Sequence, residues 1–506
     1  MKNIFNKRMA VGLMAVAMAM LTNNCTNLTN GISTDPVNIT DPTVIAASKY
    51  MSGVQVSLIG VFEGEIARGT GMWAGYFDGE DRQYTGLAGY VTSGQDYDNE
   101  WNTIYAGIFK DCQLLKHNAT PTKNQVAIGI AQVMEGMALG LAADLWGDVP
   151  WTQATQFPVI MTPVFDKQAA VYASAHALLD SAININLIPS ALGSGTGDFL
   201  LNGSKTAWIA AAHTIKARLY LHVRDYANAI IQANLGIASP AGNMMAPHGG
   251  VYLKTFNLYY SFLSYDRPGY MAGDYYAAPL LDPTSPTYRG NAKTNENGRL
   301  NYYYAPFAYW GGLNTGATYD PNVLVDFDWG TPTKDNGFFG ASTAFPLVTW
   351  QENTLILAEA YMKQATQDQT SALAALNTLR AYNNTGAQYG TSTAYASPGA
   401  LGGGFYLPYL ITDFAPAGMA NNGTDNQATA LLREILEERY VTFIGQIEGW
   451  TDMRRTNNFL GIPLPAGKSD FPRRCLYSQG EVTTNPNVPT TGVGLFDPVT
   501  SFSTAY

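Results

Sequence analysis

Residues 345–380 decide the fold class, and they read FPLVTWQENTLILAEAYMKQATQDQTSALAALNTLR. Apolar residues recur there at spacings of three and four, so two short runs each place them along one helical face: Leu355, Ala358 and Met362, then Leu373, Leu376 and Leu379. Asp368, Thr370 and Ser371 stand between the runs, where their side-chain oxygens can cap the second helix. The stretch therefore predicts a pair of helices joined by a short turn.

The spacing of this pair indicates a repeat architecture. Trp350 and Asn383 enclose 34 residues, which is the period of a tetratricopeptide helix pair. Residues 224–238 again have the Tyr, Ala, Ala spacing of the second helix in such a pair. Because neither helix of a pair can bury its apolar face alone, neighbouring pairs stack into a frame. We expect a mostly α fold, built as a tetratricopeptide-like helical-pair frame with long, aromatic-rich loop insertions and few short strands.

Frame and insertions alternate along the predicted domain, which covers residues 42–506. The helical patterns of the frame cover about 42–62, 97–237, 345–382 and 428–445. The segments that interrupt them are 63–96, 238–344 and 383–427. These segments are rich in Gly, Pro, Tyr and Asn, and they are longer than ordinary connections inside a domain. Their aromatic content argues against disorder, so we expect ordered excursions packed on the frame.

Composition limits the classes of function. Hydrophobic residues make up 46% of the 506 residues, so the chain can bury a large core. Charged residues make up only 13%, about half of the usual share. The formal net charge is −10, and the basic residues form no run longer than a pair. Nucleic acid is therefore excluded as a partner, because the basic footprint that it requires is missing.

The N-terminus has the order of an export signal. Lys2, Lys7 and Arg8 precede an apolar run at residues 9–21, which is too short to cross a bilayer as a helix. We expect residues 1–24 to be a signal peptide that is removed.

Cys25 follows at the place where a lipoprotein cysteine would stand. The motif is imperfect, because Leu21 lies four residues before the cysteine and Asn24 directly before it. We expect lipidation at Cys25, with residues 25–41 as a flexible tether to the membrane. The alternative is a soluble exported protein with an ordinary cleavage site.

The sequence shows few signs of a catalytic site. No HExxH and no GxSxG motif is present, and the five histidines have no metal-ligand spacing. Cys112 and Cys475 are far apart in sequence and predict packed free thiols. Charged residues gather near the C-terminal helix, and an ion-pair network there is favoured over an acid/base pair: Glu437, Glu438, Glu448, Arg439, Arg454 and Arg455.

Aromatic residues carry the positive signal. Tyr alone numbers 31, and the aromatic residues cluster in two of the excursions. The first cluster is GMWAGYFDGEDRQYTGLAGY at 71–90, and the second holds many tyrosines between 252 and 310. Sugar rings stack on flat aromatic rings while neighbouring polar groups bind their hydroxyls. The candidate ligand-binding residues are Trp73, Tyr76, Asp81, Arg82, Tyr84, Tyr90, Tyr309 and Trp310. The alternative is that many of these rings form local core that fixes the loops to the frame.

Several blocks of the chain resemble one family. They stand in the expected order and cover nearly all of the predicted mature chain: WNTIYAGIFKDC from Trp101, DLWGDVPWTQA from Asp144, WIAAAHTIKARLYL from Trp208, the 345–380 stretch, ILEERYVTF from Ile435, EGWTDMRRT from Glu448 and FPRRCLYSQGEVTTN from Phe471. The chain in these blocks resembles the SusD/RagB family of outer-membrane nutrient-binding lipoproteins.

The resemblance implies a function and a partner. A SusD-like protein would capture a glycan or oligosaccharide at the cell surface and deliver it to a SusC-like TonB-dependent outer-membrane transporter, over which it sits as a lid. It would perform no covalent chemistry and would be held at the outer membrane by its lipid anchor. The resemblance also implies that loops in the aromatic excursions form the ligand face. It does not identify which single residues of these loops contact the ligand.

Three alternatives remain open at this stage. RagB-like members of the family are associated with peptide uptake, so the ligand could be a peptide or glycopeptide. A surface glycoside hydrolase would need two carboxylates across an aromatic cleft, for which Asp78, Glu80 and Asp81 are the candidates. A bare tetratricopeptide scaffold would not need such long aromatic loops. No cofactor is predicted, although loop carboxylates and carbonyls could coordinate a structural calcium ion without a recognisable spacing.

Overall fold

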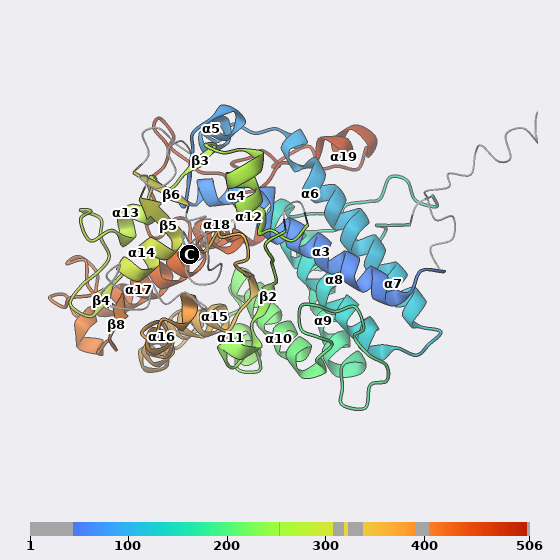
Figure 1. The fold of residues 1–506 in the computed structure, drawn as a ribbon, viewed down its shortest axis with the longest axis horizontal. Coiled ribbons are helices and arrows are strands. Elements are labelled where there is room, and N and C mark those ends of the chain that lie inside the picture. The colour runs from blue at the N-terminus through green and yellow to red at the C-terminus, as the bar shows by residue number, and fades with distance from the viewer. Residues whose placement is uncertain are drawn as a thin grey trace, which may run out of the picture. The chain divides into compact units, whose positions relative to one another are not determined.

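Consecutive helices pair along the chain, and neighbouring pairs pack against one another. The computed structural model describes residues 44–156, 158–251, 254–306, 318–321, 337–389, 404–502 and 506, and residues 47–506 form one compact unit. Figure 1 shows the frame helices running from α7 and α8 at the right to α15, α16 and α17 at the left. The frame helices are α3 (Ala47–Glu63), α7 (Asp111–Ala119), α8 (Gln125–Trp146), α9 (Gln168–Ser181), α10 (Lys205–His222), α11 (Tyr226–Ala233), α15 (Trp350–Lys363), α16 (Gln369–Asn383) and α17 (Gln427–Thr442).

The pairing follows the chain order that the sequence predicts. α3 packs against α7, α8 against α9, α10 against α11, and α15 against α16. α15 also contacts α11 and α17, so it lies in the middle of this part of the frame. The prediction of a mostly α fold built from helix pairs is therefore confirmed.

The opening stretch folds as predicted, with one detail changed at the turn. Asp368 caps α16, because its carboxylate accepts a hydrogen bond from Ser371 N at 2.9 Å. Thr370 and Ser371 lie inside the first turn of α16 rather than before it. Thr349 caps α15 in the same way, by accepting from Glu352 N at 3.1 Å.

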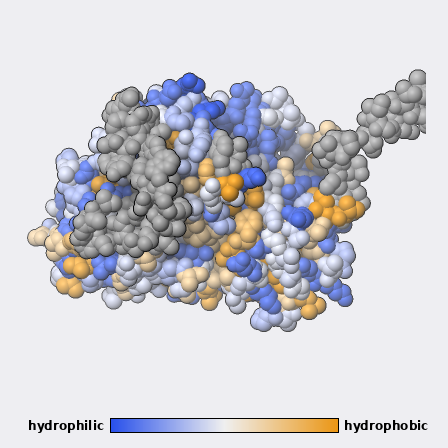
Figure 2. Space-filling model, viewed as in Figure 1, coloured by the Kyte–Doolittle hydropathy of each residue, from blue (hydrophilic) through white to orange (hydrophobic). Residues whose placement is uncertain are grey.

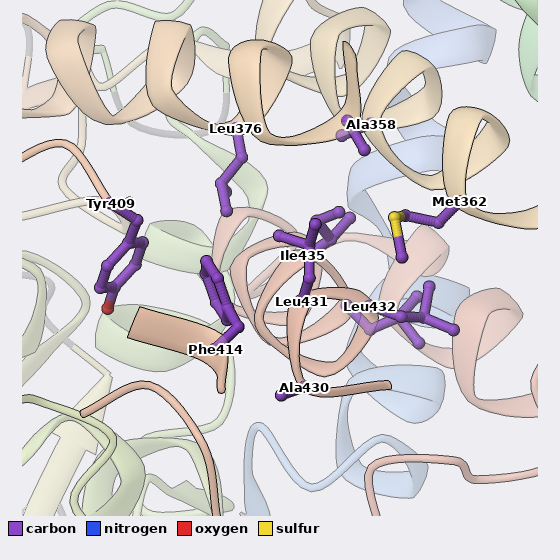
Figure 3. Packing of buried hydrophobic residues seen from close by; sticks show 11 residues of the cluster. Ala358, Met362, Leu376, Tyr409, Phe414, Ala430, Leu431, Leu432 and Ile435 are labelled. Atoms are coloured by element: carbon purple, nitrogen blue, oxygen red, sulfur yellow. The ribbon is translucent and has the colours of Figure 1, made fainter. Parts of the chain in front are cut away.

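The apolar faces of α15, α16 and α17 meet in one core cluster. Ala358 and Met362 come from α15, Leu376 comes from α16, and Leu431 and Ile435 come from α17 (Figure 3). All five side chains are buried, as the three- and four-residue spacing predicts.

The predicted thiols are buried within the domain as well. Cys112 and Cys475 are free and fully enclosed, and burial raises the pKa of both. They act as small apolar core groups, because a thiolate would be poorly solvated there.

Short strands join segments that are distant in sequence. Within the described residues they form four two-stranded antiparallel sheets. The pairs are β1 (Asp78–Gly79) with β3 (Met271–Ala272), β2 (Met244–Ala246) with β7 (Phe345–Val348), β4 (Thr294–Asn295) with β8 (Phe405–Tyr406), and β5 (Tyr304–Pro306) with β6 (Tyr319–Pro321). The first three sheets link an excursion to another excursion or to the frame, and the β5–β6 sheet lies within the excursion 238–344.

Several short helices lie outside the segments for which the sequence predicts helices, some in the excursions and some after residue 445. In two of them, glycine residues weaken the helical pattern of the sequence. In α4 (Glu65–Trp73), a Cβ at Gly71 would lie 2.9 Å from the Phe77 ring, so the glycine allows close packing rather than a turn. In α18 (Ile447–Arg455), Gly449 gives the same room to the ring of Tyr76. The remaining short helices of this kind are α5 (Arg82–Ala88), α12 (Leu258–Ser261), α13 (Ala277–Leu281), α14 (Asn297–Tyr303) and α19 (Gln479–Thr484). The short helix α6 (Asp98–Asn102) lies within the predicted frame segment 97–237.

Buried ion pairs hold α15 to its neighbours. Glu359 is fully buried and accepts a hydrogen bond from Arg455 Nη2 at 2.6 Å, with Arg439 Nε at 3.3 Å. Glu352 accepts from Arg218 Nη2 at 2.6 Å. Burial alone would raise the pKa of Glu359, but Arg455 and Arg439 lower it to about 2. The predicted ion-pair network is confirmed and is larger than the sequence indicated.

A second buried charge cluster centres on His222. Its Nδ1 lies 3.0 Å from Asp144 Oδ1, and its Nε2 lies 3.1 Å from Glu448 Oε2. Burial opposes the charged imidazolium, but the two carboxylates raise the pKa of His222 to about 9. A protonated ring donates to both carboxylates at once, which explains the direction of the shift.

Removing one partner of the α15 network should be costly. We expect Glu359→Gln to lower the free energy of unfolding by about 3 kcal/mol, because it leaves the buried guanidinium groups of Arg439 and Arg455 with Asp452 as their one shared counter-charge. Urea unfolding followed by circular dichroism measures the change. Asp470→Asn, in the half-exposed pair with Arg473, is the matched control and should cost less than about 1 kcal/mol. Equal losses in the two variants would contradict the structural role of Glu359.

Stability should fall as His222 loses its proton. Because folding raises the pKa of His222 from 6.5 to about 9, its contribution is complete below pH 6.5 and is lost as pH rises through 9. Unfolding free energies measured across this range should therefore decrease, and His222→Gln should flatten the slope. His117→Gln, at an exposed position on α7, should keep the wild-type slope. An unchanged slope in His222→Gln would show that other groups cause the pH dependence.

Candidate functional site

The two aromatic clusters meet on one side of the domain. β1 pairs with β3, which places Asp78 opposite Ala272 and Gly79 opposite Met271. Just beyond this pair, Glu80 N donates to Tyr270 O at 2.9 Å. Figure 1 shows the result, with α4, α5, α12 and β3 gathered at the upper edge of the molecule. The excursions 63–96 and 238–344 therefore build a common face, which the sequence could not establish.

Trp73 and Tyr76 lie beneath this face rather than on it. Trp73 is 2% exposed, and its Nε1 donates to Leu87 O at 2.9 Å while its ring lies 5.2 Å from the Trp450 ring. Tyr76 is fully buried and donates its hydroxyl to Tyr440 O at 2.8 Å. Neither ring offers an open face for stacking in this structure, so both act as local core.

Tyr84 and Tyr90 are also buried. The Tyr84 ring stacks on Phe262, with centroids 5.0 Å apart and an angle of 25°. Its hydroxyl accepts from Arg68 Nε at 3.1 Å and donates to Glu65 Oε1 at 2.9 Å. Tyr90 has a left-handed backbone conformation, with φ of 64°, and meets Phe496 edge-on. For these four aromatic candidates, the local-core alternative describes the structure better than direct ligand contact.

Asp81 and Arg82 are the predicted residues that solvent reaches. They form an exposed pair at 3.5 Å just before α5. The Arg82 guanidinium carbon lies 5.8 Å from the centre of the Tyr270 ring, and that of Arg267 lies 5.9 Å from it. The surface over α5 is strongly hydrophilic (Figure 2). Tyr309 and Trp310 lie outside the described residues.

Three rings that were not listed as single candidates form an accessible aromatic surface on this face, and two of them, Tyr260 and Tyr265, belong to the second aromatic cluster of the sequence. Phe256, Tyr260 and Tyr265, here called the aromatic triad, contact one another with centroids 4.9, 5.7 and 6.0 Å apart. Tyr265 is 50% exposed, while Phe256 and Tyr260 are half-buried.

The helical segment that begins with α12 contributes to the buried support of the face and also to its accessible aromatic surface. Asn257 caps α12 by accepting from Tyr259 N and Tyr260 N at 3.0 and 3.2 Å. One side of the segment directs Phe262 inward against Tyr84, and the aromatic triad occupies another. The tyrosine cluster between 252 and 310 was the available sequence signal for Tyr260 and Tyr265, whereas Phe256 lies just before the N-cap of α12 and outside any helical pattern.

Polar groups of both signs surround the triad. Asp266 accepts from Ser261 Oγ at 3.2 Å, and Arg267 follows it in sequence. Across the β1–β3 pair lie Glu80 and Asp81, both exposed. Partial burial, followed by the charges of Asp78 and Asp274, raises the pKa of Glu80. The face therefore combines flat apolar rings with carboxylate and guanidinium groups, which suits neutral molecules rich in hydroxyls.

A cavity of about 280 Å³ lies on the other side of α4 and α5. Trp73 and Tyr97 form part of its wall, and Glu65, Gln83 and Asn99 supply polar groups. The hydroxyl of Tyr84 reaches the same Glu65 from the side of the face. The cavity thus lies directly behind the layer that supports the aromatic triad.

Other features of the described residues do not point to catalysis or to membrane insertion. No group of three or more His, Cys, Asp or Glu side chains in the described part is placed to hold a metal ion. α8 is long and apolar enough to span a bilayer, but 89% of its apolar window is buried inside the domain, as in the core helix of a globular fold.

Solved structures share this architecture of helix pairs with loop excursions. A SusD/RagB family protein from Bacteroides thetaiotaomicron is 21% identical, with a TM-score of 0.62 over 91% of this chain and 98% of that one. A chitin-binding SusD homolog from Flavobacterium johnsoniae is 15% identical, with a TM-score of 0.61 over 89% and 97% of the two chains. These likenesses establish the fold.

The sequence itself establishes the family. The model of a SusD-like family, described as starch-binding and associating with the outer membrane, matches residues 40–477. The chain therefore belongs to the SusD-like family, as the resemblance predicted. No curated protein matches the chain.

The supporting role of Tyr84 can be separated from ligand contact. We expect Tyr84→Phe to lower the free energy of unfolding by about 1–2 kcal/mol, because buried Arg68 loses an acceptor. Affinity for any ligand of the face should stay within about twofold, since the ring remains in place. Thermal unfolding and isothermal titration of the same samples measure both quantities. A large loss of affinity without a loss of stability would place Tyr84 in the binding site after all.

Proposed function

We propose that this protein captures an oligosaccharide at the cell surface and binds it on the aromatic triad. The observation that carries the proposal is the accessible cluster of Phe256, Tyr260 and Tyr265 beside exposed charged groups. Each stacking contact and each hydrogen bond would contribute about 1 kcal/mol. Such contacts give modest affinity, which suits a protein that must release its ligand.

The relatives support a glycan as the ligand. The family model is described as starch-binding, and two of the similar solved structures are described as chitin-binding proteins. Both polymers present sugar rings with one apolar face, and the triad offers flat rings for that contact.

Delivery to a transporter completes the proposed role. A SusC-like TonB-dependent barrel would receive the glycan, with this protein held at the outer membrane through acyl groups on Cys25. The family description of association with the outer membrane supports this location. Cys25 and the tether lie outside the described residues. Co-purification of the tagged protein with a large outer-membrane barrel in mild detergent tests the partnership, and its absence would contradict it.

A binding role is favoured over hydrolysis. Asp81 is paired with Arg82 on an exposed turn, and Glu80 is exposed beside it. Neither residue lines the cavity behind the face. If the purified protein nevertheless turned over a glycan and Asp81→Asn abolished that turnover, the protein would be an enzyme.

Tyr265 should contribute directly to affinity. We expect Tyr265→Ala to weaken binding of maltooligosaccharides or chitooligosaccharides about tenfold, the loss of one stacking contact of about 1.4 kcal/mol. Isothermal titration with the purified mature chain measures it. Stability should hardly change, because half of the ring is already exposed.

The matched control is Phe496→Ala, an exposed aromatic residue outside the triad, which should keep wild-type affinity. Saccharide binding that is equally strong in Tyr265→Ala would remove the triad from the site. Binding of peptides but of no saccharide would overturn the glycan assignment.

A further inference from the structure

A second cavity lies apart from the aromatic triad. It has a volume of about 410 Å³ and lies between α13, α17 and the loops at 287–291 and 419–422. No triad residue lines it. In Figure 1, α13 and α17 lie at the left, away from α5 and α12 at the upper edge. The volume falls within the range of pockets that hold small organic ligands.

One wall of this cavity belongs to a buried cluster that contains more carboxyl groups than guanidinium groups. Three guanidinium groups, those of Arg289, Arg299 and Arg380, pair with four carboxylates: Glu296, Glu434, Glu437 and Glu438. When all of them are ionised, three positive and four negative groups carry one surplus negative charge. Burial opposes this charge, because it raises the pKa of Glu434 to about 7 and also raises the pKa of Glu437. Arg433, the nearest further cation, is already paired with Asp425 at 2.6 Å.

The surplus charge belongs to Glu437. Its side chain is 22% exposed, whereas those of the other three carboxylates are at most 7% exposed. Its ion-pair partner within the cluster is Arg289, whose Nε lies 3.5 Å away, which is too long for a good hydrogen bond. Glu437 lines the cavity, so its carboxylate is accessible from there.

Arg289 places a buried donor beside this carboxylate, with its Nε 3.5 Å from Glu437 Oε2. Its side chain is 2% exposed, its two Nη atoms bond to carboxylates, and its Nε has no hydrogen-bond partner. A buried donor of this kind is costly to leave unsatisfied. Because Arg289 also lines the cavity, a ligand oxygen there could accept its hydrogen bond.

The other walls suit an organic molecule rather than a metal ion. Tyr276 and Tyr288 provide aromatic groups, and Asn291 and Asn422 provide amides. Burial and then the charge of Glu437 raise the pKa of Tyr276 to about 12, which is consistent with a phenol close to that carboxylate. A divalent ion prefers six or more oxygen ligands, whereas the carboxylates that line this cavity are those of Glu434 and Glu437, and Glu434 is held by Arg289.

We propose that this cavity binds an organic cation that carries a primary ammonium group and a hydroxyl group, as an amino sugar does. The ammonium group pairs with Glu437 and restores the charge balance of the cluster. The hydroxyl oxygen accepts the hydrogen bond from Arg289 Nε. This site is independent of glycan binding at the aromatic triad.

The test compares two sugars that differ in one group. D-Glucosamine carries an ammonium group where D-glucose carries a hydroxyl, and both are titrated into the mature protein at neutral pH by calorimetry. We expect saturable binding of glucosamine and at least about tenfold weaker binding of glucose, since one charge-assisted contact is lost. Glu437→Gln should weaken glucosamine binding about tenfold and leave glucose binding unchanged.

Two further variants keep the result decisive. Glu80→Gln, beside the triad, should keep wild-type affinity for glucosamine, and a loss there would assign the amine to the triad instead. Met419→Trp narrows the cavity without touching a charge, and it should weaken glucosamine binding even if Glu437→Gln fails to fold. Absence of saturable glucosamine binding, or full affinity in Glu437→Gln or in Met419→Trp, would overturn the proposal.

Discussion

The fold depends most on the buried ion pair between Glu359 in the middle of α15 and Arg455 of α18. The carboxylate is fully enclosed, and Arg439 of α17 approaches it from a second helix. Glu352 makes the matching contact to Arg218 of α10 at the other end of α15. Charges buried this deeply are tolerated because each finds several partners, and removing one partner leaves the others exposed to the full desolvation cost. These contacts connect α15 to α10, α17 and α18.

A frame fixed in this way can carry long loops without losing its shape. The excursions are attached to it by the β2–β7 sheet and by buried tyrosines such as Tyr76, whose hydroxyl donates to the backbone of α17. The accessible rings of the aromatic triad lie on or just before the capped helical segment that begins with α12. Tyr84 supports this segment from beneath by stacking on Phe262. Support and ligand contact are therefore divided between different aromatic residues of the same face. The family model matches residues 40–477, which include both the frame and the excursions. The identity of the ligand depends on the excursions alone.

The frame was readable from the sequence because its signal is local. Spacings of three and four residues identified α15 and α16, and they also identified the side chains that became core, such as Ala358 and Leu376. The site was less readable, since exposure depends on contacts between distant segments. Trp73, Tyr76, Tyr84 and Tyr90 have the residue types of a sugar platform, but tertiary packing buries them. Phe256 lies outside any helical pattern, and the glycines of α4 resemble a loop until their close packing is seen. The surplus charge at Glu437 emerges only when Arg289, Arg299 and Arg380 are brought together by the fold.

The central claim is that a glycan contacts the loops and leaves the helical frame untouched. Hydrogen–deuterium exchange of the mature protein, with and without a saturating oligosaccharide, tests it directly. We expect protection in residues 78–88 and 256–276, with no change in α10, α15 or α16. Protection that appears instead on the frame helices, with the two loop segments unchanged, would contradict it.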